Sequence, residues 1–91
     1  MNHKKLIKVA KTLLDVRSSS EYSHRHIAGS INIPLEQLVS RLDEFEMLEK
    51  PIITFSRNGN RSEKAITILK SNGINQVYDA GELSKVLLNL N

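Results

Sequence analysis

Short apolar runs bounded by polar clusters predict the strands of this chain. Residues 12–17 (TLLDVR) lead into three serines, and residues 51–55 (PIITF) lead into a polar loop that contains glycine. Apolar runs of this length between turn residues are typical of buried strands, so we predict a first strand at 12–17 and a central strand at 51–55. Residues 76–78 (QVY) predict a further short strand of the length found at sheet edges.

Apolar residues also recur at helical spacing. The spacing between 35 and 48 predicts one helix of about four turns, with an acidic face toward solvent and its end at Pro51. A second helix is expected from near Arg61 to residue 72, with Gly73 just past its end. Residues 83–90 predict a terminal helix, and Ser19 or Ser20 is expected to cap a short helix over 21–23.

Strands and helices therefore alternate, which predicts an α/β fold with a small, mostly parallel central sheet flanked by helices. The 91 residues suffice for one domain, which we place at 1–91. The hydrophobic fraction of 40% and charged fraction of 25% are ordinary for a globular domain, and the few aromatics predict an aliphatic core.

Composition excludes several kinds of site. The chain has no cysteine, which rules out disulfides, thiolate metal sites and a cysteine nucleophile. The net charge is +3, and the N-terminal lysines are interpreted as a solvated face because no basic stripe with aromatics indicates nucleic-acid binding. No apolar run approaches the ~20 residues that span a bilayer. We expect a cytoplasmic monomer with no metal and no cofactor.

The loop after the central strand carries the candidate chemistry, in the residues Ser56, Arg57, Asn58, Gly59, Asn60 and Arg61. A strand, a tight loop and a helix N-terminus can turn successive N–H groups toward one anion. Gly59 permits a positive φ, which Asn58 or Asn60 can also tolerate, and the two arginines add charged donors. The spacing alone fits a plain strand-to-helix connection with solvated arginines equally well.

Two separated motifs resemble the rhodanese family: LDVR at 14–17 with EY at 21–22 and HIAGSINIP at 26–34, and then ITFSRNGNRS at 53–62. The resemblance runs from about Leu13 to Gly81. It implies a parallel sheet, a cradle loop from Ser56 to Arg61 of the sulfur-transfer length, and a cysteine nucleophile at the first loop position. It also implies a thiosulfate or persulfide donor anion and a thiophilic acceptor such as a protein thiol. The single Gly81 stands where the family often carries two glycines.

Serine at position 56 is the main departure from the family. A hydroxyl ionises far less readily than a thiol, and it needs an adjacent base to become a nucleophile. His3, His24 and His26 are the candidate bases, and none belongs to the loop, so serine catalysis is the least favoured hypothesis. Two hypotheses remain: a non-catalytic module that binds an oxyanion or a protein, and a sulfurtransferase whose cysteine is substituted here.

The remaining polar residues of the first motif are interpreted structurally. Asp15 is expected to accept hydrogen bonds from nearby loops, and Asn32 to bond backbone groups. Arg17 and Glu21 are expected to form an ion pair, which contributes little if it is exposed.

Overall fold

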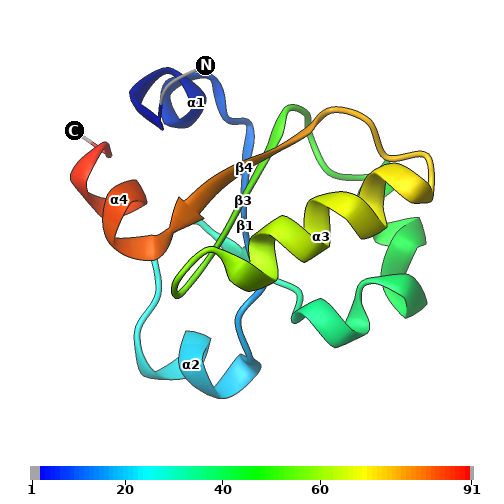
Figure 1. The fold of residues 1–91 in the computed structure, drawn as a ribbon, viewed down its shortest axis with the longest axis horizontal. Helices are drawn as coiled ribbons and strands as arrows, with labels where there is room; N and C mark the ends of the chain where they lie inside the picture. Colours follow the sequence, from blue (N-terminus) through cyan, green and yellow to red (C-terminus); the bar gives the residue numbers. More distant parts are fainter. Residues whose placement is uncertain (1–2, 91) are drawn as a thin grey trace.

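A four-stranded sheet forms the centre of the computed structural model, which describes residues 3–90 (Figure 1). The strands lie in the order β2-β1-β3-β4, and every pairing is parallel. The predicted α/β class and the central position of the third strand are confirmed. The strands are β1 (Thr12–Asp15), β2 (Ile31–Asn32), β3 (Ile52–Ser56) and β4 (Val77–Glu82).

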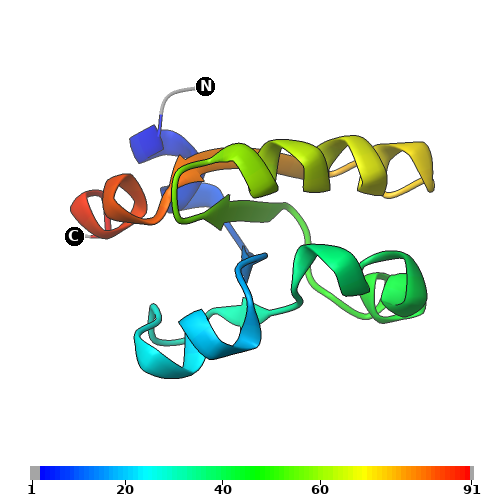
Figure 2. The same cartoon turned by 60° about the horizontal axis from the view of Figure 1, so that its bottom comes forward.

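Helices cover both faces of this sheet, and Figure 2 shows α4 and η2 at opposite ends of the molecule. One buried cluster joins β1 and β3 to α3 and the 3₁₀ segments, through residues such as Leu14, Leu69 and Phe45. A second cluster on the other face joins Ile53 and Phe55 of β3 to α1, β4 and α4. The helical elements are α1 (His3–Val9), α2 (Ser19–His24), η1 (Leu35–Gln37), η2 (Val39–Glu46), α3 (Asn60–Ser71) and α4 (Leu83–Leu88).

The prediction of one long helix over 35–48 is wrong. The segment forms two 3₁₀ helices, η1 and η2, with non-helical dihedral angles at Arg41. Its inward residues are 35, 38, 42, 45 and 48, so that most steps are three residues. A 3₁₀ helix has three residues per turn, and this geometry places them on one side. The expected solvent-exposed acidic face, residues 43, 44 and 46, is confirmed.

Three local predictions also need correction. The N-cap of α2 is Ser18, not Ser19 or Ser20, because Ser18 forms a reciprocal capping box with Glu21. The lysine-rich N-terminus is more than the expected solvated face, because it forms α1, whose Leu6 is buried. The strand predicted at 76–78 extends as β4 to Glu82, so that it reaches the candidate loop.

The strand order places the end of β3 at a switch point of the sheet. After β1 the chain moves to one side to form β2 and then returns to the other side to form β3. Neighbouring connections leave a crevice at the carboxyl ends of such strands, where α/β proteins bind ligands. Asp15 ends β1 and Ser56 ends β3 at this edge.

Among residues 3–90, every helix is too short or too polar to cross a bilayer.

Candidate functional site

Ser56 is the last residue of β3 and lies fully buried at the base of the candidate loop. Its hydroxyl oxygen accepts the backbone N–H groups of Gly59 and Ser62, each at 3.1 Å. The hydroxyl donates to Ser62 Oγ at 3.3 Å, and Ser62 Oγ donates to the Gly59 carbonyl at 3.0 Å. One N–H group from the loop and one from the first turn of α3 thus converge on the Ser56 side chain.

The loop is shorter than its six predicted residues. Ser56 belongs to β3, while Asn60 and Arg61 belong to the first turn of α3, so that only residues 57–59 connect the two elements. Gly59 is the N-cap of α3 with φ 90°, as its predicted positive φ requires. Asn58 and Asn60 do not share this conformation, because the positive φ values among residues 3–90 all belong to glycines. The Asn58 side chain instead accepts the Asn60 N–H at 3.1 Å.

Gly59 also lies against β4. A Cβ atom at this position would lie 3.4 Å from the Gly81 Cα, in van der Waals contact with the neighbouring backbone. Gly81 has a positive φ of 80°, and its N–H donates to the Asp79 carboxylate at 2.7 Å. One glycine from each segment therefore lets the loop and β4 approach closely.

Arg61 is held by an acidic partner that the sequence analysis placed elsewhere. Its guanidinium donates to both carboxylate oxygens of Glu21, at 2.5 and 3.0 Å. The hydrogen bond from Arg61, with further bonds from Ser18, lowers the pKa of Glu21 to about 2. The pair ties α2 to the first turn of α3, and the positive charge of Arg61 is neutralised beside the loop.

The predicted ion pair between Arg17 and Glu21 is wrong. Arg17 pairs with Asp15 instead, with Nη2 at 2.6 Å from Oδ2, and both side chains are buried. Asp15 also accepts the Arg17 backbone N–H at 2.9 Å, so a partner two residues away satisfies this carboxylate without any long-range contact. The prediction that Asp15 accepts hydrogen bonds is confirmed, as is that for Asn32, whose amide donates to the carbonyls of Asp15 and Arg17.

The three histidines make no hydrogen bond with Ser56 among those of residues 3–90. His26 stacks on Tyr22, and its Nδ1 lies 2.9 Å from the Tyr22 carbonyl oxygen. The His3 ring lies near Gly81 on the β4 side of the loop. With its lone pairs facing N–H donors and its proton directed to Ser62, the Ser56 hydroxyl has no base in this arrangement.

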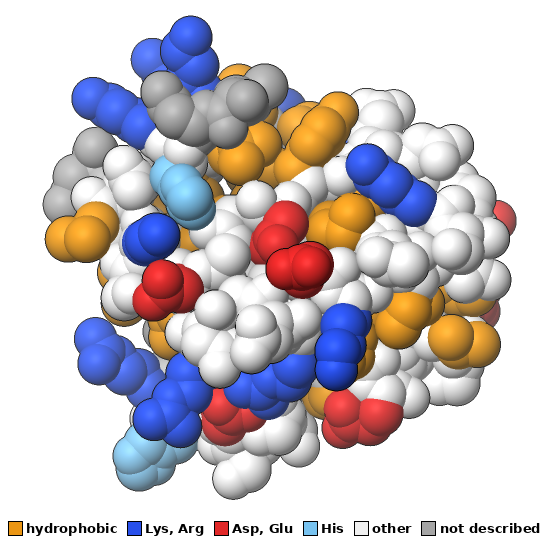
Figure 3. All heavy atoms as spheres, in the orientation of Figure 1, with side chains coloured by type: hydrophobic (Ala, Val, Ile, Leu, Met, Phe, Trp, Pro, Cys, Tyr) orange, Lys and Arg blue, Asp and Glu red, His pale blue; other side chains and the backbone are white. Residues whose placement is uncertain are grey.

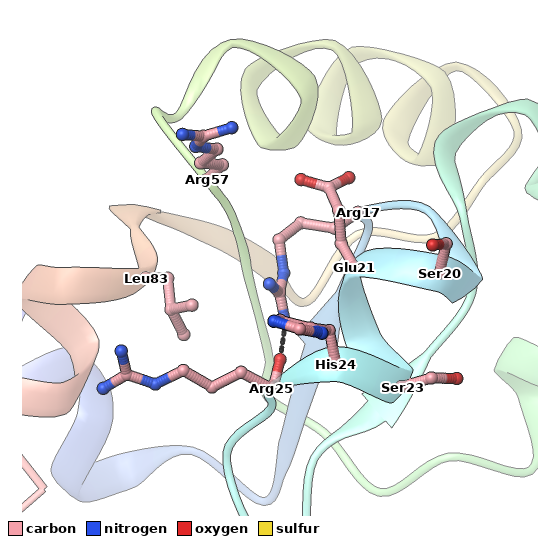
Figure 4. A pocket seen from close by; sticks show the side chains of 8 residues that line it. All are labelled: Arg17, Ser20, Glu21, Ser23, His24, Arg25, Arg57 and Leu83. Atoms are coloured by element: carbon pink, nitrogen blue, oxygen red, sulfur yellow. Dashed lines mark hydrogen bonds between the residues drawn. The ribbon is translucent and has the colours of Figure 1, made fainter.

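A hollow of about 750 Å³ lies beside the loop, between α2 and the start of α4 (Figure 4). We call it the arginine hollow. The sequence analysis included Arg57 of this group but missed Arg25; the signal available for Arg25 was the basic run His24-Arg25-His26. The hollow is lined by Arg17, Ser20, Glu21, Ser23, His24, Arg25, Arg57 and Leu83.

A second, smaller hollow of about 330 Å³ lies on the other side of the loop. Asn58, Gly59 and Asn60 line it together with residues 79–82. The six predicted residues thus do not share one cavity: Ser56 is at the base, Arg57 faces one hollow, the next three face the other, and Arg61 is paired with Glu21. Within residues 3–90, no three His, Asp or Glu side chains gather as metal ligands.

Comparison with known proteins gives a consistent result. The model of the family described as "Rhodanese-like domain" matches residues 2–81. The uncharacterized protein YqhL of Bacillus subtilis is 39% identical over 67 residues, which cover 74% of this chain and 52% of that protein. Thiosulfate sulfurtransferase PspE of Escherichia coli is 29% identical over 80 residues, which cover 87% of this chain and 77% of that protein.

A solved structure has the same architecture. A rhodanese with anions from E. coli superposes with a TM-score of 0.74 and 30% identity, covering 84% of this chain and 91% of that one. Among curated relatives the shared part is often small, and the chain spans about half the length of YqhL and 36% of the putative sulfur carrier protein YrkF of B. subtilis.

Proposed function

This chain belongs to the rhodanese-like domain family, and from that premise we propose that it is a member that binds an oxyanion or a partner protein at the Ser56 loop without transferring sulfur. Ser56 stands where the motif resemblance places the cysteine of active members. The observation that carries the proposal is the buried Ser56 hydroxyl, which accepts two backbone N–H groups and has no basic partner.

Sulfur transfer needs a thiolate at this position. The thiolate attacks the outer sulfur of a donor such as thiosulfate, a sulfur–sulfur bond forms, and sulfite leaves with the electron pair of the broken bond. A serine oxygen would first have to lose its proton, and a base within hydrogen-bond reach normally takes it. The Ser56 proton is directed to another hydroxyl, so the loop lacks the proton acceptor that this step requires.

The surroundings of the loop support binding of an anionic group. Arg57 is exposed at the loop and lines the arginine hollow, where a guanidinium can donate to an oxyanion. The N-terminus of the twelve-residue helix α3 adds a partial positive charge at the end of the loop. The similar E. coli rhodanese was solved with anions, which is consistent with this expectation.

The second candidate is a sulfurtransferase whose cysteine is substituted in this chain. The two N–H groups that hold the Ser56 oxygen would also stabilise a thiolate at the same position, because a thiolate is a stronger acceptor than a hydroxyl. The similarity to thiosulfate sulfurtransferase PspE is consistent with this alternative.

Thiocyanate formation from thiosulfate and cyanide tests the proposal. The assay compares the chain as it stands with its Ser56→Cys variant, and Ser62→Cys serves as a matched control that places a thiol at the neighbouring buried serine. We expect no thiocyanate from the Ser56 protein or the control. Turnover by the Ser56 protein would overturn the proposal.

The cysteine variant separates the two candidates. If Ser56→Cys alone turns over, the loop retains its sulfur-transfer geometry, which favours the substituted sulfurtransferase. If it does not, the binding module is the better account.

Binding is measured by titrating sulfate or thiosulfate while amide NMR signals of residues 57–61 are followed. The absence of any shift at about millimolar anion would contradict anion binding in the loop.

A further inference from the structure

The acidic groups around the arginine hollow are already paired. Asp15 neutralises Arg17 beneath the hollow, and Glu21 neutralises Arg61 at its edge. Two further guanidinium groups, those of Arg25 and Arg57, have no carboxylate partner among the ion pairs and hydrogen bonds of residues 3–90. The hollow therefore has a net positive charge that no described acid of the chain balances.

These two arginines approach the hollow from different elements. Arg25 follows α2 and Arg57 follows β3, and Figure 4 shows their side chains on opposite sides, with Leu83 between them. Both residues are exposed. Figure 3 shows Lys and Arg side chains gathered over α2 and the loop, with a histidine at the border of the group.

The floor of the hollow is preorganised. Arg17 is buried and fixed by Asp15, and its Nη2 donates to the backbone carbonyl of Arg25 at 2.7 Å. This contact anchors the backbone from which the Arg25 side chain projects. A rigid backbone under flexible charged ends lowers the cost of ordering the site when a ligand binds.

The size of the hollow indicates an extended ligand. The hollow is broad and open to solvent, and its volume of about 750 Å³ far exceeds that of a single sulfate ion. A compact anion would reach only one side of the hollow and would leave Leu83 uncovered. An extended chain with separated carboxylates can reach both guanidinium groups and place an apolar side chain on Leu83.

We propose that the arginine hollow binds an acidic peptide segment of a partner protein, with carboxylates on Arg25 and Arg57 and an apolar side chain against Leu83. The inference rests on the proposed function and specifies it, because it defines the chemistry of the protein that docks beside the Ser56 loop. Ser20 and Ser23 line the same hollow.

The test uses a blocked peptide, Asp-Glu-Leu-Asp-Glu-Gly, and its neutral isostere, Asn-Gln-Leu-Asn-Gln-Gly, titrated into the whole chain under NMR observation. We expect the acidic peptide to shift the amides of residues 20–25, 57 and 83, and the neutral peptide to leave them unchanged. In the double variant Arg25→Gln/Arg57→Gln we expect affinity to fall roughly tenfold or more, as the loss of two charge-assisted contacts implies.

A charge-matched control separates a specific site from general attraction. The double variant Lys64→Gln/Lys70→Gln removes the same charge from exposed positions of α3 and should keep the affinity within about twofold of the unchanged chain. Equal weakening by both double variants would overturn the proposal, as would no shift with the acidic peptide. Tighter binding of citrate at the same residues would also overturn it in favour of a small polyanion.

Failure of this inference is distinguishable from failure of the proposed function. Peptide binding is read from amide shifts and does not involve the Ser56 hydroxyl, whereas the proposed function is tested by thiocyanate formation. If the chain forms no thiocyanate and its amide signals do not shift with the acidic peptide, only the inference is overturned. Thiocyanate from the Ser56 protein overturns the proposed function whatever the peptide does.

Discussion

At the scale of single residues, the Glu21 carboxylate connects two helices beside the loop. Glu21 accepts from Arg61 while its side chain also completes the cap of α2 through Ser18. One carboxylate therefore fixes the start of α2 and connects it to the start of α3. The same contact removes Arg61 from the donors that an incoming anion could use, which leaves Arg57 as the accessible arginine of the predicted loop.

The substitution Glu21→Gln tests this pair, because an amide keeps the acceptor for the helix cap but loses the charge. We expect the free energy of unfolding at neutral pH to fall by about 1–2 kcal/mol, a value reduced by solvent screening of a pair that is roughly 30% exposed. Urea denaturation measures the loss. Glu44→Gln is the control, since Glu44 pairs with Arg41 on a more exposed surface, and a smaller loss is expected there.

The same pair predicts a pH dependence. The pKa of Glu21 is lowered from 4.5 to about 2 in the folded chain, so its contribution is complete above pH 4.5 and declines as the pH falls toward 2. Across this interval the urea midpoint of the unchanged chain should fall more steeply than that of Glu21→Gln. Parallel curves for the two proteins would show that the ion pair does not contribute.

At the scale of elements, the junction of β3, the loop and α3 depends on glycine. Gly59 begins α3 in a left-handed conformation, and a Cβ atom there would lie 3.4 Å from the Gly81 Cα of β4. Gly73 ends the same helix with φ 84°, but a Cβ atom there would meet nothing within 4 Å. Both glycines therefore have a positive φ, and they differ in the space that a side chain would find around them.

Alanine at each glycine measures the cost of the left-handed conformation in these two surroundings. Gly73→Ala should lose about 1–2 kcal/mol, the cost of a left-handed non-glycine residue. Gly59→Ala should lose a similar amount, because its added methyl group would lie at ordinary van der Waals distance from Gly81. Urea denaturation of both variants provides the comparison, and a much larger loss for Gly59→Ala would show that the space beside β4 also limits this position.

At the scale of the whole molecule, two apolar clusters hold helices on opposite faces of one small sheet. The family match ends at residue 81, yet α4 follows it and buries Val86 completely against the second cluster. The C-terminal helix is therefore part of the folded unit, and it also positions Leu83 in the arginine hollow.

Substitutions on α4 measure this contribution. Val86→Ala removes two buried methyl groups and should lower the free energy of unfolding by about 2 kcal/mol. Leu88→Ala, on the same helix, should stay within about 0.5 kcal/mol because Leu88 is 81% exposed. If Val86→Ala leaves the single unfolding transition unchanged, α4 does not fold together with the sheet.

Local patterns determined much of this structure. The apolar runs at 12–17 and 51–55 contain most of β1 and β3, although β1 ends at Asp15 and β3 extends to Ser56, because a continuous buried run suits a strand covered on both faces. Gly73 ends α3 as expected, since only a residue free of a Cβ adopts its φ without cost. The same reasoning gave the wrong helix type for the segment 35–48, because apolar residues spaced by three and four positions are compatible with both α and 3₁₀ helices.

The sequence by itself determined the α/β class, the absence of a thiol and the position of Ser56 after the central strand, because these depend on neighbours along the chain. Only the tertiary structure decided which charges meet: Arg61 finds Glu21 forty residues away, and Arg25 and Arg57 face one hollow from separate elements. Side-chain partners across such distances depend on how strands are ordered in the sheet, and no local pattern records that order.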